Sequence, residues 1–498
     1  MILVTLSEAN FEYDIHSLVK AFFPKEEVNV SAEVKEPKGK VSVSAEDEVR
    51  EKPLFFMEIT YCLGGGEPDA VLFFIDGEEK GRVSVDYAER IQTKNRLKQE
   101  LYRVLSRYTG TTLPWGTLTG IRPTKIPMNF LEEGKDEEWI RRYMRDMYFA
   151  GEKKIDLSIE IAKRELKLLE QVDYEDGYSL YIGIPFCPST CLYCSFTSYP
   201  LGKWAGRMEE YLDALEKEMD FTAEACRHKK LNTIYIGGGT PTTLTAEQLD
   251  RLLTKIEQTF DFTWLVEYTV EAGRPDSITG DKLLALKKHN ISRISINPQT
   301  MKQETLDLIG RHHTVEQTIE SFELARSLGF DNINMDLIVG LPEETISDVQ
   351  NTMEQLKRLD PDSITVHSLA IKRAARLRMF KEDYQDLHIQ NTWETIELTA
   401  RYAAEAGLMP YYLYRQKNMA GNFENVGYAK EGKAGIYNIL IMEEKQSIMA
   451  LGAGATTKYV FDGGKRIERT ENVKDIENYL NRVDEMIERK RMGIEKYM

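Results

Sequence analysis

The chain has 498 residues, of which 42% are apolar and 29% are charged, and its formal net charge is -16 at pH 7. This length predicts one large domain with smaller ones attached, because a single hydrophobic core stops growing at about 250 to 300 residues. The negative charge disfavours nucleic acid as a partner. The amino terminus has no basic segment followed by an apolar run, and no stretch reaches the roughly 18 apolar residues of a membrane helix, so we expect a cytoplasmic protein without a membrane span.

The first 110 residues predict a small α+β domain. The segments "KVSVSAE", "PLFFMEITYCL" and "AVLFFIDGEEKGRVSVDY" are typical of antiparallel strands with a polar turn, and "AERIQTKNRLKQELYRVLSRY" is typical of a helix. Residues 111–175 predict a mostly helical connector, in which "TGIRPTKIP" marks a turn between domains.

From residue 179 onward, short apolar runs alternate with longer amphipathic runs, which is the pattern of βα units. Strands are predicted at 179–186, 233–239, 267–273, 293–299, 332–340 and 363–370, with helices such as "TAEQLDRLLTKIEQTF" between them. This order favours a parallel, barrel-like α/β sheet over residues 176–385, with its chemistry at the carboxyl ends of the strands. Residues 386–498 predict a C-terminal region with a helix at 390–406, a strand-like run "ILIMEEKQSIMALGAGA" and a charged terminal helix.

The segment "PFCPSTCLYCSF" follows the first of these strands and holds Cys187, Cys191 and Cys194. Three thiolates on one short loop can converge on a metal centre. A closed zinc site would need a fourth protein ligand, and no further Cys or His lies nearby. A four-iron cluster held by three cysteines leaves one iron open for chemistry, so we predict an iron-sulfur site. The isolated Cys62 and Cys226 are expected to be inert thiols.

The pattern Cys187-x3-Cys191-x-Tyr-Cys194 resembles the radical S-adenosylmethionine (SAM) superfamily. In that superfamily the open iron of a [4Fe-4S] cluster chelates SAM, and an electron delivered through the cluster releases a 5'-deoxyadenosyl radical. The resemblance implies a partial (β/α)6 radical SAM barrel with an N-terminal α+β domain and a small C-terminal α/β extension. It also implies that the chain binds one or two SAM molecules.

Within the superfamily, the sequence is similar to the oxygen-independent coproporphyrinogen III oxidase family. The similarity rests on "YIGIPFC", "GGGTPT", "RISINPQTMKQETLDLIGRHHT", "NINMDLIVGLPEET" and "LGAGATTK", and the whole-chain pattern is nearest to the coproporphyrinogen dehydrogenase HemZ branch. The resemblance counts Tyr181 with the three cysteines as catalytic. It implies that the SAM molecule is held by Tyr181, Phe186, Gly237, Gly238, Gly239, Thr240, Glu271, Gln299, Arg311 and Asp336.

Each implied role suits its residue type. Tyr181 would stack near the sulfonium, Gln299 and Arg311 would bind ribose and carboxylate, and Asp336 would hold ribose or a second ligand. Glycines let a backbone approach a ligand closely. The adjacent His312 and His313 are predicted to be helix-end caps.

Two departures leave the function within this family open. Phe196 stands where the oxidases carry a fourth cysteine. The heme-chaperone relatives hold heme with a His-Asn-x-x-Tyr-Trp stretch, whereas this chain has no histidine after His388. The alternatives to an oxidase are therefore a heme-chaperone-like protein and a radical SAM enzyme with another substrate.

The resemblance implies an enzyme of heme biosynthesis that decarboxylates two propionates of coproporphyrinogen to vinyl groups, giving protoporphyrinogen. Its substrate would need cationic side chains beside an apolar wall. We expect a monomer that takes electrons from a donor such as flavodoxin or ferredoxin. The predicted substrate contacts are Lys372, Arg373, Arg376, Arg378 and Arg415.

Overall fold

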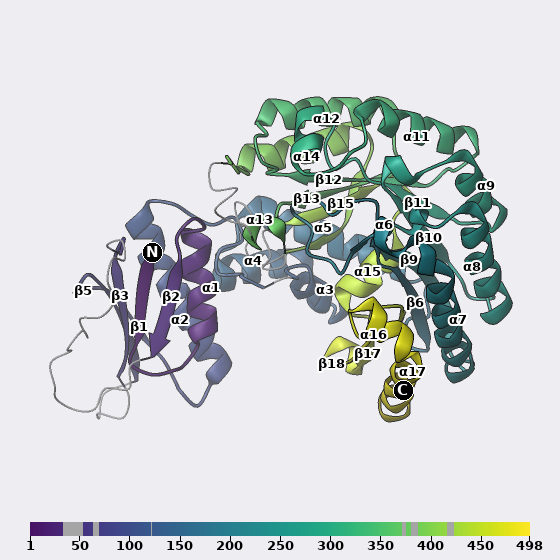
Figure 1. The fold of residues 1–498 in the computed structure, drawn as a ribbon. Helices are drawn as coiled ribbons and strands as arrows, with labels where there is room; N and C mark the ends of the chain where they lie inside the picture. The colour runs from purple at the N-terminus through teal and green to yellow at the C-terminus, as the bar shows by residue number, and fades with distance from the viewer. Residues whose placement is uncertain (33–52, 63–68, 121, 371–374, 380–386, 416–422) are drawn as a thin grey trace, which may run out of the picture. The chain divides into compact units, whose positions relative to one another are not determined.

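The computed structural model describes residues 1–32, 53–62, 69–120, 122–370, 375–379, 387–415 and 423–498. These residues form two compact units, Met1–Ile159 and Glu160–Met498, and Figure 1 labels their elements. The predicted strand "KVSVSAE" lies outside the described residues, and the bounds of the four predicted domains stay predictions. Among the described residues, no helix combines the length and the apolar character needed to cross a bilayer.

The described part of the first unit contains a five-stranded sheet in the order β2-β1-β3-β4-β5. Strand β1 pairs in parallel with β2 and β3, while β3, β4 and β5 are antiparallel. The turn between β4 and β5 is Asp76-Gly77, with φ of 50° and 83°, which is the left-handed geometry of a tight hairpin. The predicted hairpin is thus confirmed. The strands are Ile2–Leu6 (β1), Val28–Ala32 (β2), Phe56–Cys62 (β3), Ala70–Ile75 (β4) and Glu78–Ser84 (β5).

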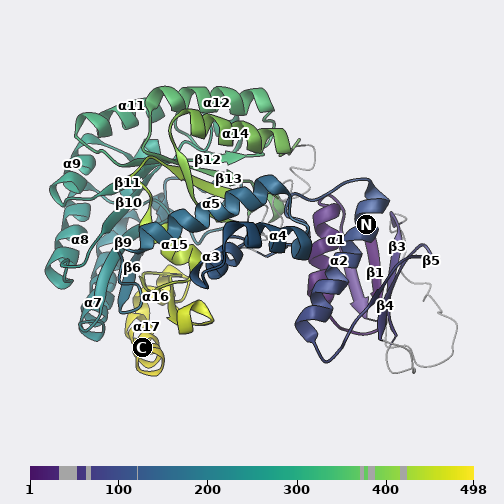
Figure 2. The same cartoon turned by 180° about the vertical axis from the view of Figure 1, so that it is seen from behind.

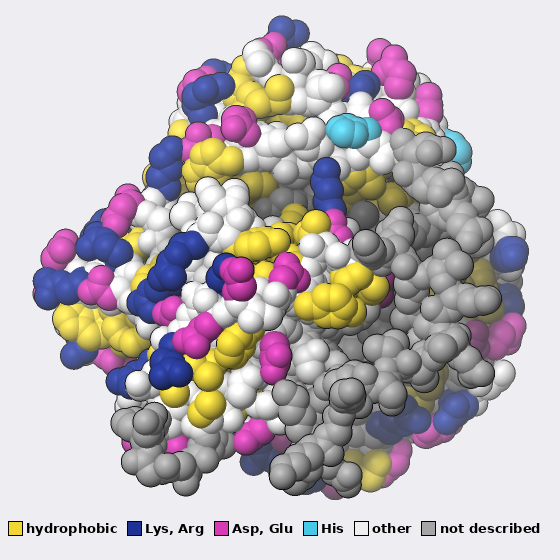
Figure 3. All heavy atoms as spheres, turned by 90° about the vertical axis from the view of Figure 1, so that its left-hand side faces the viewer, with side chains coloured by type: hydrophobic (Ala, Val, Ile, Leu, Met, Phe, Trp, Pro, Cys, Tyr) yellow, Lys and Arg dark blue, Asp and Glu magenta, His cyan; other side chains and the backbone are white. Residues whose placement is uncertain are grey.

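One face of this sheet is covered by helices. In β4 the side chains alternate between buried and half-buried, and Val71, Phe73 and Ile75 share a core with Leu18 and Leu97 from two helices. On the face in Figure 3, basic and acidic side chains are interspersed among the coloured residues. The helices are Glu12–Phe22 (α1), Arg90–Thr109 (α2), Lys125–Glu132 (α3), Glu137–Tyr148 (α4) and Glu152–Leu169 (α5), the last of which continues into the second unit.

The described second unit is built on an eleven-stranded sheet in the order β14-β15-β13-β12-β11-β10-β9-β6-β16-β17-β18. Its middle six strands are parallel and almost wholly buried, as expected for strands that are covered on both faces. The predicted parallel α/β sheet and its six strands are therefore confirmed. They are Gly177–Ile184 (β6), Lys230–Gly238 (β9), Glu267–Gly273 (β10), Arg293–Ile296 (β11), Ile333–Val339 (β12) and Ser363–Ser368 (β13).

Helices α7, α8, α9, α11 and α12 lie along the outer side of this sheet in both Figure 1 and Figure 2. Thr245, Thr314 and Thr345 begin three of them with capping boxes, which fix where each strand-end loop stops. His312 and His313 follow the helix Gln303–Leu308, whose C-cap residue is Ile309. Both ring nitrogens of His313 are buried without a hydrogen-bond partner in the described structure, so the prediction that His313 is a helix-end cap is wrong. The bounds are Met208–Ala225 (α7), Ala246–Thr259 (α8), Gly280–Lys288 (α9), Val315–Ser327 (α11) and Ile346–Leu359 (α12).

The C-terminal part of the chain extends the same sheet at both edges. Strands β14 and β15 join antiparallel beside β13, whereas β16 is parallel to β6 and is followed by antiparallel β17 and β18. The elements are Trp393–Glu405 (α14), Met409–Tyr414 (β14), Asn425–Ala429 (β15), Ile436–Glu443 (α15), Ser447–Leu451 (β16), Thr456–Phe461 (β17), Arg466–Glu471 (β18), Ile476–Asn481 (α16) and Val483–Tyr497 (α17).

The run "ILIMEEKQSIMALGAGA" is only partly the predicted strand. Its first residues belong to α15, where Ile439 and Leu440 are buried against Tyr411 and Tyr412 of β14. A short apolar run fits a buried helix as well as a strand, and here tertiary packing decides between them. The remaining short elements are Phe186–Cys187 (β7), Tyr199–Pro200 (β8), Leu201–Trp204 (α6), Gln303–Leu308 (α10) and Arg376–Met379 (α13).

Candidate functional site

The cysteine loop leaves the carboxyl end of β6 and is anchored along its length. Phe186 and Cys187 form a two-residue strand that pairs with Tyr199 and Pro200 where the loop returns. Inside the loop, the Leu192 amide donates to the Ile309 carbonyl at 2.9 Å, and the Ser189 hydroxyl donates to the Gly310 carbonyl at 2.8 Å. The segment after β11 thus supports the loop from outside.

The three thiols of this loop line one cavity and lie close enough to influence one another electrostatically. Cys191 is buried, and Cys187 and Cys194 are half-buried. Burial raises the pKa of the Cys187 thiol to about 11 and also raises that of Cys194, and in both cases the neighbouring thiols add to the effect. Because thiolates are the metal-binding form, such thiols gain most from a cation placed among them.

The number of thiols distinguishes between two kinds of metal centre. A closed structural zinc site takes four protein ligands, whereas the loop supplies Cys187, Cys191 and Cys194. A four-iron cluster held by three thiolates keeps one iron open for a ligand. The three-thiol donor set therefore fits the cluster better than structural zinc.

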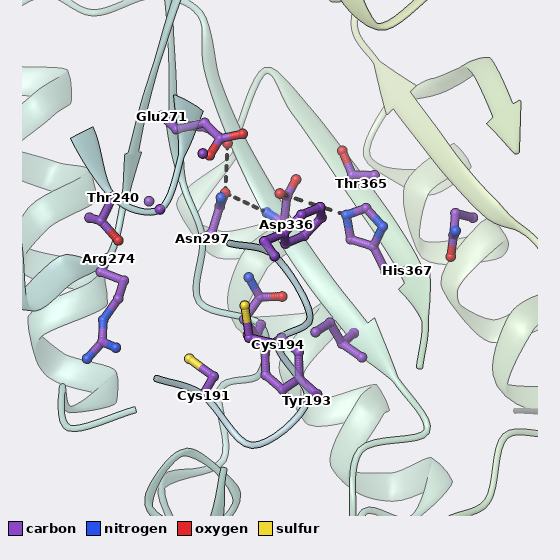
Figure 4. Close-up of a pocket in the computed structure, with 18 of the residues that line it drawn as sticks. Cys191, Tyr193, Cys194, Thr240, Glu271, Arg274, Asn297, Asp336, Thr365 and His367 are labelled. Carbon is purple, nitrogen blue, oxygen red and sulfur yellow. Dashed lines mark hydrogen bonds and ion pairs between the residues drawn. The ribbon is translucent and has the colours of Figure 1, made fainter. Parts of the chain in front are cut away.

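A cavity of about 340 Å³ opens beside the thiols, at the carboxyl ends of the parallel strands. Figure 4 shows the cysteines at one end of it, Arg274 and Thr240 on one wall and His367 on the opposite wall. Most of the residues predicted to bind the cluster or SAM meet in it. The lining includes Cys187, Cys191, Cys194, Gly238, Gly239, Thr240, Glu271, Gln299, Arg311 and Asp336.

The glycine turn after β9 lies directly against the start of the cysteine loop. The Gly239 amide donates to the Ile184 carbonyl at 2.8 Å, and the Thr240 amide donates to the Phe186 carbonyl at 2.7 Å. A Cβ atom on Gly239 would lie 2.6 Å from that Phe186 oxygen, so only glycine fits. The predicted Phe186 is itself buried and, like Gly237, is not part of the cavity lining.

Two acidic side chains at the top of the cavity differ in their electrostatics. Burial raises the pKa of Glu271 to about 7, although the Tyr235 hydroxyl donates a hydrogen bond to it. Burial acts in the same direction on Asp336, but His367 and Asn334 outweigh it and leave the pKa of Asp336 below its ordinary value. Near neutral pH, Asp336 is therefore ionised, whereas Glu271 is present in both its protonated and its ionised form.

Two arginines near the cysteines are fixed by hydrogen bonds and an ion pair to other residues of the protein. The Arg311 guanidinium donates to the carbonyls of Gly273 and Asn297 at 3.3 and 2.5 Å, and Arg274 pairs with Asp276 at 2.6 Å. Within the described structure, Arg311 Nε and Gln299 Oε1 are buried without a hydrogen-bond partner. Both residues line the cavity, and buried polar atoms ordinarily have a partner, which a bound polar ligand such as SAM would supply.

Several lining residues were not anticipated from the sequence. Asn297 accepts a hydrogen bond from the Asp336 amide at 3.3 Å, and Tyr193 accepts one from Arg311 at 3.3 Å. His367 and Tyr235 lie within strands that were predicted, but alternation along a strand does not say which face meets a ligand. Further members of this set include Arg274, Asn334, Thr365, Tyr412 and Tyr414.

A second cavity, of about 500 Å³, adjoins the first and shares Ser195, Phe196 and Gly238 with it. Tyr181, predicted to stack on SAM, lines this second cavity, and its ring is stacked 6.3 Å from that of Tyr235. The wall combines apolar side chains with two lysines and one carboxylate, and it includes Tyr437, Ile441, Ile448, Ala450, Lys458, Glu471 and Lys474.

The predicted substrate contacts are placed only in part. Lys372 and Arg373 lie outside the described residues, as do the side chains of Arg376 and Arg378. Arg415 is buried, which lowers its pKa to about 10, and it lines neither cavity. The roles of these residues stay predictions.

Residues 181–356 match the Radical SAM superfamily. Over 464 residues, the chain is 40% identical to the oxygen-independent coproporphyrinogen-III oxidase-like protein HemZ of Bacillus subtilis, covering 88% of this chain and 93% of that protein. The chain belongs to this radical SAM family. Its membership implies a [4Fe-4S] cluster and SAM as the cofactors, as the cysteine spacing predicted.

Some of the similar proteins are named heme chaperones and not oxidases. The chain is 33% identical to the heme chaperone HemW of Bacillus subtilis over 308 residues, which cover 62% of this chain and 76% of that protein. The solved structure of coproporphyrinogen III oxidase (HemN) from Escherichia coli matches with a TM-score of 0.50 at 22% identity, over 65% of this chain and 73% of that chain. That match supports the radical SAM fold alone.

Proposed function

We propose that the protein is an oxygen-independent coproporphyrinogen III oxidase. The observation that carries this proposal is the second cavity, which adjoins the cysteine-lined cavity and combines an apolar wall with two lysines. Coproporphyrinogen is an apolar macrocycle bearing four propionates, and a site for it needs both features. We place the macrocycle against Ile441, Ile448 and Ala450, with propionates reaching Lys458 and Lys474.

Bound to the protein, the cluster and SAM supply a 5'-deoxyadenosyl radical. Cys187, Cys191 and Cys194 hold three irons and leave the fourth without a protein ligand. Gln299, Arg311 and Asp336 orient the SAM nucleoside and carboxylate from the strand ends. Gly238 lines both cavities. Because glycine has no side chain, the reacting carbon of the substrate can come close to the SAM site at this point.

The substrate loses a hydrogen atom from the β-carbon of a propionate, then carbon dioxide and one electron, and a vinyl group remains. One electron enters to cleave SAM and one leaves to an external one-electron acceptor. SAM and one propionate therefore give methionine, 5'-deoxyadenosine, carbon dioxide and one vinyl group. Two rounds convert coproporphyrinogen to protoporphyrinogen.

The test is anaerobic incubation of reconstituted protein with SAM, a reductant and coproporphyrinogen, followed by mass measurement of the porphyrin product. We expect two vinyl groups per substrate and one methionine for each. Lys458→Ala and Lys474→Ala should raise the KM for coproporphyrinogen and leave SAM affinity unchanged. An unchanged porphyrin together with tight heme binding would instead favour the heme-chaperone function of the HemW relatives.

A further inference from the structure

His367 occupies a position in the cavity that the sequence did not single out. It lies in β13, and Figure 4 shows it opposite Arg274 and Thr240, pointing toward Asp336. Its Nε2 atom is 3.8 Å from Asp336 Oδ2, and its Nδ1 atom is 3.2 Å from the Tyr414 hydroxyl. The imidazole is therefore held from both sides, by residues of β12 and β14.

Asp336 also makes hydrogen bonds with residues other than His367. Its Oδ1 atom accepts a hydrogen bond from the Asn334 side chain at 2.7 Å, and its amide donates to Asn297 at 3.3 Å. About a fifth of the Asp336 side chain and a quarter of the His367 side chain are exposed, both into the cavity. Asn334 thus binds Oδ1, Oδ2 faces His367, and Thr365 also hydrogen-bonds to the carboxylate.

The charges nearby show why Asp336 depends on His367. Glu271 is a second carboxylate at this end of the cavity, and it and Asp336 disfavour each other's ionised form. Arg274 is paired with Asp276, and Arg311 donates to backbone carbonyls on the cysteine side. Arg293 donates to the Ser363 hydroxyl at 3.3 Å, and it also interacts electrostatically with Glu267 and Asp336. In the described structure, His367 is the cation-forming side chain within 4 Å of Asp336.

We propose that His367 is a positioning residue for SAM, which together with Tyr414 keeps the Asp336 carboxylate ionised and turned toward the two ribose hydroxyls. A carboxylate accepts two hydroxyl hydrogen bonds well only when it is both charged and correctly oriented. The inference rests on SAM as the cofactor and on the predicted contact between Asp336 and ribose. It does not depend on the oxidase activity.

The test compares two ligands in reconstituted, cluster-loaded protein. Equilibrium dissociation constants are measured for SAM and for its 2',3'-dideoxy analogue, which lacks the ribose hydroxyls. We expect His367→Phe to weaken SAM roughly tenfold or more, the scale of one charge-assisted hydrogen bond, and to leave the analogue within about twofold. His367→Gln keeps an N–H donor toward Asp336 and should lose less.

Two further variants separate a positioning role from a general structural one. Tyr414→Phe should weaken SAM by a smaller factor with the same preference for the full ligand. His228→Phe, on an exposed histidine after α7, is the matched control and should change neither constant. Equal losses for SAM and the analogue, or no loss of SAM affinity in His367→Phe, would overturn the proposal. Iron content and cluster absorbance confirm that each variant carries the cluster. The binding measurement uses no porphyrinogen, so its result stays valid even if the oxidase assay fails.

Discussion

Lys490 and Glu218 form a buried ion pair whose removal should destabilise the second unit strongly. The two side chains are 1% and 0% exposed, and Lys490 Nζ lies 2.9 Å from both Glu218 Oε1 and the Ala450 carbonyl. Glu218 also accepts hydrogen bonds from the Gly452 amide, Tyr479 and Asn472. The pair therefore links α7, β16 and α17.

Lys490→Met would remove the cation and leave the buried Glu218 carboxylate without an opposite charge, with the hydrogen bonds from Gly452, Tyr479 and Asn472 remaining. Breaking one side of such a pair costs about 3 to 5 kcal/mol. Burial raises the pKa of Glu218, and in the native protein Lys490 and Tyr479 outweigh this and lower it. A lowered pKa means that the native protein loses stability as pH falls, whereas the variant, with a raised pKa, should regain stability toward acid pH.

The measurement is chemical denaturation of the native protein, Lys490→Met, and Glu218→Gln/Lys490→Met across pH. The double variant carries no buried charge and should recover part of the loss. Lys255→Met breaks an exposed pair with Asp220 and is the control, with an expected cost of about 0 to 1 kcal/mol. A loss below about 1 kcal/mol for Lys490→Met, or an acid response like that of the native protein, would refute this reasoning.

Three further predictions concern the candidate site. Cys191→Ala should abolish both the iron-sulfur absorbance and SAM cleavage, and retention of both would remove the basis for the cluster assignment. Gly239→Ala would place a methyl group 2.6 Å from the Phe186 carbonyl, so the reconstituted variant should bind less iron, and normal iron content would show that the turn can move. Because burial raises the pKa of Glu271 from 4.5 to about 7, the apoprotein should lose stability as pH rises between those values. Thermal unfolding should show this slope flattened in Glu271→Gln, and an identical slope would contradict the assigned pKa.

The sequence predicted the parallel sheet and the cysteine loop because both are local patterns. Apolar runs alternate with amphipathic helices, and the three cysteines lie within eight residues. His367, Asn297 and Tyr414 escaped prediction because their importance depends on which strands become neighbours. Tyr414 reaches His367 only because β15 and β14 join the sheet beside β13.

Tertiary packing also determines whether some segments form helices or strands and how the strands pair, which the sequence alone leaves open. The run that begins α15 is as apolar as a strand, and it becomes a helix because Ile439 and Leu440 pack against β14. In the first unit, β1 pairs in parallel with β2 and β3. These pairings join residues that are far apart in the sequence, so local patterns do not predict them. The tyrosine predicted to contact SAM, Tyr181, lines the neighbouring cavity.

The position of β16 has a consequence for how the protein matures. This strand is made late in synthesis, yet it pairs with β6, the strand that leads into the cysteine loop, and α17 secures it through Lys490. A nascent chain that has not yet emerged beyond Leu451 exposes one edge of β6. Firm support of the cysteine loop therefore depends on residues that lie far beyond that loop in the sequence.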